Sequence, residues 1–231
     1  MNLSNIDSLE SRILFIDNHL IVINKLPGEL VQADKTGDQC LADLVKLYLK
    51  EKFNKPGDVY LGLLHRIDRP VSGIVAFART SKAAARLSQA IQDRKWHKEY
   101  HAITLPWKAE ALGVLEHWLR KDAAKNKSFA VSESDSNGKR AVLHFQLLRH
   151  LDRYSVMKII LETGRHHQIR CQLSLAGFPI KGDLKYGAKR SNPDSSISLH
   201  ARRLVFEHPV QKITIDIQAD YPEYWLDKEA K

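Results

Sequence analysis

A carboxylate set between two arginines, just before an apolar run, is the most unusual residue pattern in this chain of 231 residues. Asp68 lies between Arg66 and Arg69, and Pro70 and Gly73 then lead into an apolar run. Nearby positive charges hold a carboxylate in its ionised form. A loop that leaves a buried strand is a common position for reactive groups. We therefore expect Asp68 to be functional and ask what supports it and what is brought to it.

A second candidate is the basic segment 163–170, which reads TGRHHQIR. The pattern predicts a short helix from about 165 to 176, ended by Gly177. Its spacing would place His166, His167 and Arg170 on one side. Helix N-termini attract anions, so this end could bind an anion or supply a positive partner for a carboxylate delivered from elsewhere. A basic helix end that faces solvent explains the segment about equally well.

The third candidate is residues 94–101, which read RKWHKEYH. Basic residues interleaved with Trp96 and Tyr100 suit nucleic acid, because phosphates attract cations and unstacked bases pack on flat rings. The local pattern by itself favours the alternative, in which Tyr100 is a half-buried strand residue.

Several other chemistries are not supported. The segment 65–68 (HRID) has one residue more than the kinase HRD loop, and neither a glycine-rich phosphate loop nor DFG follows. There is no Walker or dinucleotide pattern and no serine nucleophile elbow. His65, Asp68, His166 and His167 have the types of metal ligands but no tight ligand spacing. We expect no metal and no cofactor.

The predicted elements that must position these residues are mostly strands. Their irregular mixture with a few helices favours an α+β fold with a mixed sheet in one domain. Residues 121–138 are polar and are predicted to be a long excursion or mobile loop. Periodicity and turn residues predict a hairpin at 12–16 and 20–24, helices at 38–53 and 81–94, strands at 98–105, 141–148 and 154–161, and a second hairpin at 199–206 and 212–218.

The charge balance points to a polyanionic partner. Lys and Arg number 36 against 27 Asp and Glu, which gives a formal net charge of +9. RNA, DNA and an anionic membrane all fit, as does a protein that is simply basic. Cys40 and Cys171 read as free thiols in a reducing compartment. With no secretory signal and no apolar run of membrane-spanning length, we expect a cytoplasmic protein with no membrane partner.

Taken together, these segments resemble the RluA-type pseudouridine synthases. The matching motifs follow one another in the family's order from about residue 12 to 220. They are 24–28 (NKLPG, similar to NKPxG), 65–73 (HRIDRPVSG, similar to HRLDxxTSG), 98–102 (KEYHA, similar to KxYxA), 164–170 (GRHHQIR), and the block at 177–187 that contains GFPIKGD and YG. The chain departs from the family pattern at Leu26, Val71 and Gln172.

The resemblance implies the pseudouridine synthase fold, a mixed and mainly antiparallel sheet flanked by a few helices. It implies one catalytic domain, 1–231 with its core at about 12–220, with a central active-site cleft and without the small N-terminal RNA-binding domain of many relatives. The implied activity is that of an isomerase that converts a specific uridine in structured tRNA or rRNA to pseudouridine. The uridine must be flipped out of the RNA. No metal, cofactor or nucleotide is implied, and a monomer is the default expectation.

The resemblance also implies a role for each matching residue. Asp68 is the catalytic carboxylate, acting as nucleophile or as base toward the sugar. Tyr100 stacks on the flipped uracil and serves in proton transfer at carbon 5, and Arg170 keeps Asp68 ionised. The implied substrate-binding residues are Arg66, which fills the gap left in the RNA, Ile169, which packs on the base, and His65, Arg165 and His167.

Two other classes of protein compete with this interpretation. A non-catalytic RNA-binding protein on the same scaffold would not need a carboxylate in a cationic groove. A metal-dependent nuclease or hydrolase would lose activity with chelators, whereas the synthase would not.

Overall fold

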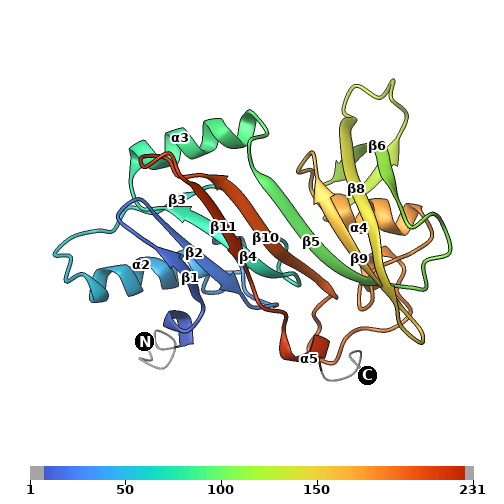
Figure 1. Cartoon of the computed structure of the whole chain (residues 1–231), viewed down its shortest axis with the longest axis horizontal. Coiled ribbons are helices and arrows are strands. Elements are labelled where there is room, and N and C mark those ends of the chain that lie inside the picture. The colour runs from blue at the N-terminus through green and yellow to red at the C-terminus, as the bar shows by residue number, and fades with distance from the viewer. Residues whose placement is uncertain (1–7, 227–231) are drawn as a thin grey trace. The chain divides into compact units, whose positions relative to one another are not determined.

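The computed structural model describes residues 8–226 and divides the chain into two compact units. Unit 1 contains residues up to 96 together with 201–222, and unit 2 contains 97–200 together with the residues from 223 onward. Unit 1 therefore gathers strands from both ends of the chain, as the blue and red ribbons in Figure 1 show.

Unit 1 is built on a sheet in which β1, β2, β4 and β10 are successive neighbours, with β3 beside β4 and β11 beside β10. The pairs β1–β2, β2–β4, β3–β4 and β10–β11 are antiparallel, which confirms both predicted hairpins. The strand bounds are β1 (Ile13–Ile16), β2 (Leu20–Lys25), β3 (Gly62–Leu63), β4 (Ser72–Ala78), β10 (Leu199–Glu207) and β11 (Thr214–Gln218).

Unit 1 also contains the helices α2 (Leu41–Lys52) and α3 (Ser81–Gln92), which lie close to their predicted bounds. Helix α3 packs against β3 and β4. The Thr80 side chain begins it by accepting the Ala83 N–H. All seven residues of β4 are buried, so the apolar run after Pro70 forms the centre of this unit and fixes where the Asp68 loop ends.

Unit 2 is a five-stranded antiparallel sheet in the order β5, β9, β8, β6, β7. Helix α4 packs against β6 and β7 over a buried apolar cluster that includes Leu119 and Tyr186. The bounds are β5 (His97–Thr104), β6 (Leu112–Asp122), β7 (Lys127–Val131), β8 (Lys139–His150), β9 (Ser155–Leu161), α4 (Gln168–Leu175), the 3₁₀ helix η1 (Leu184–Tyr186) and α5 (Glu223–Leu226).

The prediction of a long excursion at 121–138 is wrong. Strand β6 continues to Asp122, the chain turns through 123–126, and β7 returns along it with Lys121 opposite Ser128. Among the described strands β7 pairs with β6 alone, and its one fully buried residue is the polar Ser128. Its short stretch of alternation therefore lacks the apolar run that would mark a buried strand.

The predicted start of the C-terminal helix is also wrong. Helix α4 begins at Gln168, and His167 before it has a left-handed backbone with φ of 51°. Arg165, His166 and His167 therefore form a turn ahead of the helix, and they do not share a helical side with Arg170.

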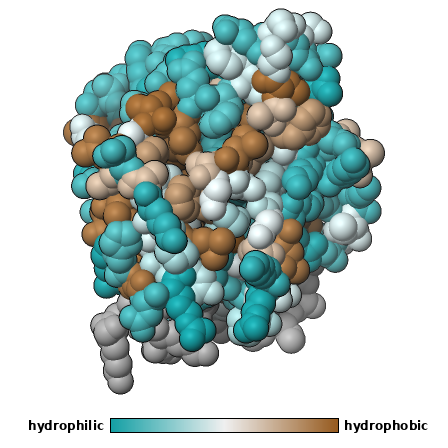
Figure 2. All heavy atoms as spheres, turned by 90° about the vertical axis from the view of Figure 1, so that its right-hand side faces the viewer, coloured by the Kyte–Doolittle hydropathy of each residue, from teal (hydrophilic) through white to brown (hydrophobic). Residues whose placement is uncertain are grey.

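The fold class is confirmed as α+β, with mainly antiparallel strands and a few helices. Within residues 8–226, none of the helices is long and apolar enough to cross a membrane. Figure 2 views the molecule from the side on which β6 and β8 lie in Figure 1 and shows hydrophobic side chains interspersed among hydrophilic ones. The exposed apolar side chains of unit 2 include Leu112 and Val114 of β6.

Candidate active site

The Asp68 loop joins β3 to β4 in unit 1. Its far end is a tight turn, because the Val71 N–H donates to the Asp68 carbonyl oxygen at 3.0 Å. Gly73 follows inside β4 with φ of +109°, and a Cβ on it would lie 2.3 Å from the Ala201 carbonyl oxygen of β10. Only glycine fits so close to the β10 backbone. Gly73 therefore lets β4 enter the sheet a few residues after Asp68.

The turn at 24–28 holds the residue that follows Asp68. The Gly28 N–H donates to the Arg69 carbonyl oxygen at 2.7 Å, and Arg69 Nε donates back to the Gly28 carbonyl oxygen at 2.9 Å. Arg69 also pairs with Asp38 at 2.8 Å on the exposed side. The arginine that was expected to flank Asp68 as a charge partner is thus bound to the 24–28 turn and Asp38.

Lys25 is the least expected residue of unit 1, because its side chain is completely buried. Its ammonium group donates to three backbone carbonyl oxygens, those of Leu26 at 2.8 Å, Glu29 at 2.9 Å and Arg69 at 3.1 Å. A buried lysine needs such acceptors, since removing it from water is costly. Lys25 therefore ties the 24–29 turn to the Asp68 loop.

Burial lowers the pKa of Lys25 from 10.5 to about 7. The carboxylates of Glu29 and Asp68 act in the opposite direction, and the guanidinium groups of Arg12 and Arg69 add to the lowering. Lys25 is thus a partly titrating positive charge within electrostatic reach of Asp68.

His65 and Arg66 differ sharply in their surroundings. His65 Nε2 accepts the Ala76 N–H of β4 at 3.1 Å, and its ring meets the edge of Trp96 with centroids 5.5 Å apart. Arg66 is exposed, and within the described part of the chain it makes no hydrogen bond or ion pair. The structure thus shows how His65 holds the loop, while its expected contact with substrate stays a prediction. Arg66 keeps its side chain available.

Arg170 in unit 2 lies in the first turn of α4 and is 5% exposed. It forms a two-pronged pair with Asp183, with Nε to Oδ2 at 2.7 Å and Nη2 to Oδ1 at 2.9 Å. Its guanidinium also lies 5.1 Å from the centroid of the Tyr186 ring. Such paired bonds fix the plane of the guanidinium as well as its position.

The turn before α4 is fixed by a buried polar cluster. His167 Nδ1 lies 3.0 Å from the Tyr186 hydroxyl, which accepts the Ser128 N–H at 2.7 Å. The Ser128 hydroxyl contacts His166, both at the ring nitrogen Nδ1 and at the carbonyl oxygen. Burial, helped by the positive charge of Arg170, lowers the pKa of His167 to about 2, so its ring stays neutral. Strand β7 therefore positions this turn.

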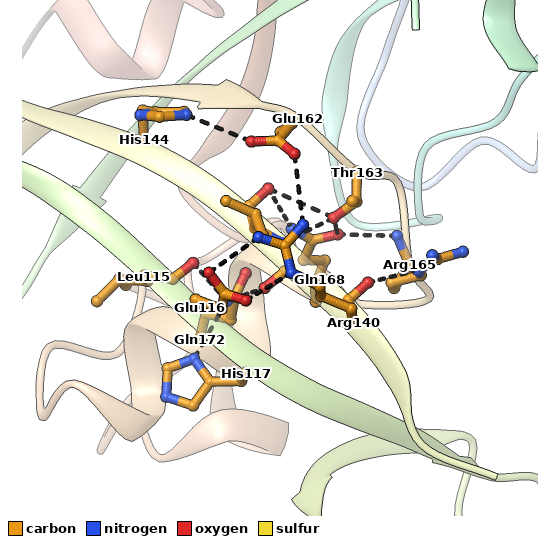
Figure 3. A network of polar contacts seen from close by, with 12 residues as sticks. Leu115, Glu116, His117, Arg140, His144, Glu162, Thr163, Arg165, Gln168 and Gln172 are labelled. Carbon is orange, nitrogen blue, oxygen red and sulfur yellow. Dashed lines mark hydrogen bonds and ion pairs between the residues drawn. The ribbon is translucent and has the colours of Figure 1, made fainter. Parts of the chain in front are cut away.

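Gln168 explains why the helix starts late (Figure 3). Its Oε1 accepts the Arg165 N–H at 2.9 Å and the Thr163 hydroxyl at 2.8 Å, and its Nε2 donates to the Val142 carbonyl oxygen of β8. These contacts hold residues 163–165 outside the helix, ahead of the turn at 166–167. Arg165 is exposed, and its Nε donates to the Arg140 carbonyl oxygen at 2.9 Å.

Tyr100 lies in β5 opposite Ile159 of β9 and is 8% exposed. Its neighbours Glu99 and His101 project from the other side of the strand, where His101 Nε2 lies 3.0 Å from a Glu99 carboxylate oxygen. Ile169 is buried in α4 beside Arg170. The expectation that Tyr100 is a strand residue is confirmed.

The expected site residues therefore fall into two groups. His65, Arg66 and Asp68 belong to unit 1, whereas Tyr100, Arg165, His167, Ile169 and Arg170 belong to unit 2. The support of Asp68 by Arg170 stays a prediction. Within residues 8–226, no group of three or more His, Cys, Asp or Glu side chains could hold a metal ion.

Sequence reasoning gave no role to three residues that the structure makes prominent, Lys25, Asp183 and Tyr186. All three lie in motifs of the family pattern, NKLPG and the GD and YG of the 177–187 block. A lysine or aspartate beside a glycine turn usually faces solvent, so nothing local indicated that both are buried.

Comparisons with known proteins match nearly the whole chain. Residues 19–175 match the family model described as RNA pseudouridylate synthase. The ribosomal large subunit pseudouridine synthase D of Zymomonas mobilis is 31% identical over 221 residues, which cover 91% of this chain and 69% of that protein. The ribosomal large subunit pseudouridine synthase C of Rickettsia typhi is 30% identical, covering 94% and 70%.

Solved structures are similar in fold. Human RNA Pseudouridylate Synthase Domain Containing 4 has a TM-score of 0.80 and 23% identity, covering 96% of this chain and 92% of that one. Human RNA Pseudouridylate Synthase Domain Containing 1 has a TM-score of 0.72 and 22% identity, covering 96% and 87%.

Proposed function

The chain belongs to the RNA pseudouridylate synthase family, and from this premise we propose that Asp68, Tyr100 and Arg170 carry out its reaction. The protein is an RNA pseudouridine synthase, an isomerase. In this isomerisation the bond from the ribose to N1 of uracil breaks and a bond from the same ribose carbon to carbon 5 forms. A proton leaves carbon 5 and N1 ends with one, so the reaction has no net reactant besides the uridine.

We propose that Asp68 is the carboxylate that acts on the sugar, as nucleophile or as base. Both roles need an ionised side chain at a fixed position. The observation that carries this proposal is the anchoring of the Asp68 loop. The carbonyl oxygen of the next residue, Arg69, accepts hydrogen bonds from both Lys25 and Gly28, while its own guanidinium is bound to the same turn.

We propose that Arg170 supports the Asp68 carboxylate and that Tyr100 stacks on the flipped uracil and moves the proton at carbon 5. The two-pronged pair with Asp183 fixes the plane of the Arg170 guanidinium, and a guanidinium with five N–H donors is able to bond more than one carboxylate. Ile169, Arg66, His65, Arg165 and His167 complete the proposed substrate-binding set. Because the matched residues 19–175 extend over both units, we also propose that the two units act as one catalytic domain.

The proposed substrate is a uridine in structured RNA, and large-subunit ribosomal RNA is favoured over tRNA. The relatives described above are named for the large ribosomal subunit, and a net charge of +9 suits a large polyanion. We also propose a cytoplasmic location, which two buried cysteines without a disulfide support. A monomer is proposed by default.

The test maps pseudouridines in ribosomal RNA and tRNA from a strain that lacks the gene, by chemical modification and primer extension. One or a few sites in large-subunit ribosomal RNA should vanish, return with the wild-type gene and stay absent with Asp68→Asn. Loss of a tRNA site would instead overturn the substrate class. Restoration of the sites by Asp68→Asn would overturn the role of the carboxylate.

A further inference from the structure

A basic pocket lies within unit 2, and Arg165 of the proposed substrate-binding set is one of its lining residues. It has a volume of about 490 Å³ and lies between the β6–β7 hairpin, the start of β8 and the turn before α4. We call it the β7 pocket. Its lining residues are Leu119, Arg120, Lys121, Ser128, Asn137, Lys139, Gly164, Arg165 and His166.

The strand register brings two lysines of the β7 pocket together. Leu119 of β6 is paired with Lys139 of β8, and Lys121, two residues further along β6, is paired with Ser128 of β7. Positions two apart on a strand share a face, so Lys121 and Lys139 are diagonal neighbours whose Cα atoms lie roughly 7–8 Å apart. Leu119 and Ser128 are buried, whereas both lysines are exposed.

Three cations of the β7 pocket have no neutralising partner in the described part of the chain. Lys121, Lys139 and Arg165 make no ion pair with any carboxylate in residues 8–226. Arg120, by contrast, is neutralised by Asp135 at 2.8 Å and lies over the Phe129 ring. Like charges held together without counter-charges repel one another, so such a cluster favours an anionic occupant.

The turn at 164–166 is held in place before any ligand arrives. Gln168 and Arg140 bind the Arg165 backbone and Nε, and both ring nitrogens of His166 have partners, Ser128 Oγ at 2.8 Å and Asn126 Oδ1 at 3.1 Å. The terminal nitrogens of Arg165 have no hydrogen-bond partner in residues 8–226. A guanidinium fork and two ammonium groups around a fixed concavity match the oxygens of a phosphate.

We propose that the β7 pocket binds a backbone phosphate of the RNA substrate. This inference rests on the proposed function only in taking RNA as the partner. Lysines supply charge and Arg165 supplies directed hydrogen bonds, so the contact orients the RNA without reading its sequence. The β6–β7 hairpin then has a defined task, because it carries Lys121 and, through Ser128, holds the turn that presents Arg165.

The first test measures the affinity for an unmodified large-subunit ribosomal RNA transcript at several KCl concentrations. The variant is the double substitution Lys121→Gln and Lys139→Gln, and the matched control is Lys125→Gln, an exposed lysine at the tip of the same hairpin. The double variant should bind roughly tenfold more weakly. The slope of log K against log salt should become shallower by about 0.7–0.9 for each phosphate that the variant no longer neutralises. A double variant that behaves like the control would overturn the proposal.

The second test uses the RNA as its own probe. Replacing single phosphates by neutral methylphosphonates around the mapped uridine should weaken wild-type binding at one position that no longer matters in the double variant. Inorganic phosphate distinguishes a free-anion site. The NMR signal of the Lys139 side chain reports whether millimolar phosphate binds. If phosphate shifts this signal while the double substitution leaves the affinity for RNA unchanged, the pocket binds small anions and the RNA proposal fails.

These results stay separate from the catalytic proposal. With saturating RNA, the double variant should form pseudouridine at the wild-type rate, with only the RNA concentration for half-maximal rate increased. If the wild-type protein binds RNA through the β7 pocket but forms no pseudouridine, the catalytic assignment is refuted. The proposal that the β7 pocket binds a phosphate would not be affected.

Discussion

The two units hold their functional loops in different ways. In unit 1 the Asp68 loop is fixed at a backbone acceptor, the Arg69 carbonyl oxygen, which is bound by the Lys25 ammonium and the Gly28 N–H. In unit 2 Arg170 is fixed through side chains, by the carboxylate of Asp183 and the ring of Tyr186. An anchor at the carbonyl oxygen of residue 69 tolerates a change of the Arg69 side chain, whereas an ion pair between buried groups fails when either partner is removed.

The largest effect should come from Asp68 itself. Asp68→Asn keeps the shape of the side chain but removes the charge, and turnover should fall by at least about 10⁴-fold, the scale seen when a nucleophile or base is removed. Single-turnover pseudouridine formation measures the rate, and RNA affinity measured in parallel should stay within a few-fold of wild type. Wild-type turnover would exclude Asp68 from the chemistry.

Breaking the unit 2 anchor should cost the most stability. Asp183→Asn removes the negative charge of the carboxylate that pairs with the buried Arg170 guanidinium, and the free energy of unfolding should fall by about 3–5 kcal/mol. Glu207→Gln is the matched control, because it breaks an exposed pair with Lys212 and should cost less than about 1 kcal/mol. Urea unfolding measures both. Equal decreases would mean that burial of the Arg170 pair does not matter.

Lys25 should give the unit 1 anchor a pH dependence. Its pKa is about 7 in the folded protein and near 10.5 when unfolded. Between pH 7 and 10.5 the unfolded chain therefore binds more protons than the folded protein. The contribution of Lys25 to the free energy of unfolding rises across that window, by about 1 kcal/mol per pH unit. Lys25→Met should lack this rise.

The test requires urea unfolding of the wild-type protein and of Lys25→Met at pH 7 and pH 9. Only the difference in free energy of unfolding between the two proteins isolates the effect of Lys25. The wild-type advantage should increase with pH. An advantage that stays constant from pH 7 to 9 would show that the amine is not titrating in this window.

The smallest effect is expected for the Arg69 side chain. Its pair with Asp38 is about half exposed at both ends, so Arg69→Lys should change the free energy of unfolding by less than about 1 kcal/mol. Turnover should fall only slightly, since the backbone carbonyl oxygen of residue 69 remains in place. A destabilisation as large as that of Asp183→Asn would mean that unit 1 also depends on a side-chain pair.

The elements with strong periodicity could be predicted from the sequence. Helix α3 and the β1–β2 hairpin follow from regular apolar spacing and turn residues, and Asp68 stood out by its neighbours. Strand β7 could not be predicted, because only its pairing with β6 and its contact with the 164–166 turn define it. The late start of α4 depends on Gln168 reaching back to Thr163, which competes with the local helical pattern.

The partners of the site residues were equally hidden. Asp183 lies 13 residues from Arg170, and Lys25 lies 44 residues from Arg69. A lysine and an aspartate are normally surface residues, so only the folded chain shows that both are buried. Motif resemblance pointed to these positions but could not say what they contact.

The burial of Lys25 makes this one amine a built-in reporter. The complete burial of the Lys25 amine keeps acylating reagents away from it while the 24–29 turn is closed. Pulse labelling should therefore modify Lys25 only in molecules whose 24–29 turn has opened. Mass spectrometry of that single residue would then count how often the Asp68 loop comes loose, and whether bound RNA closes it.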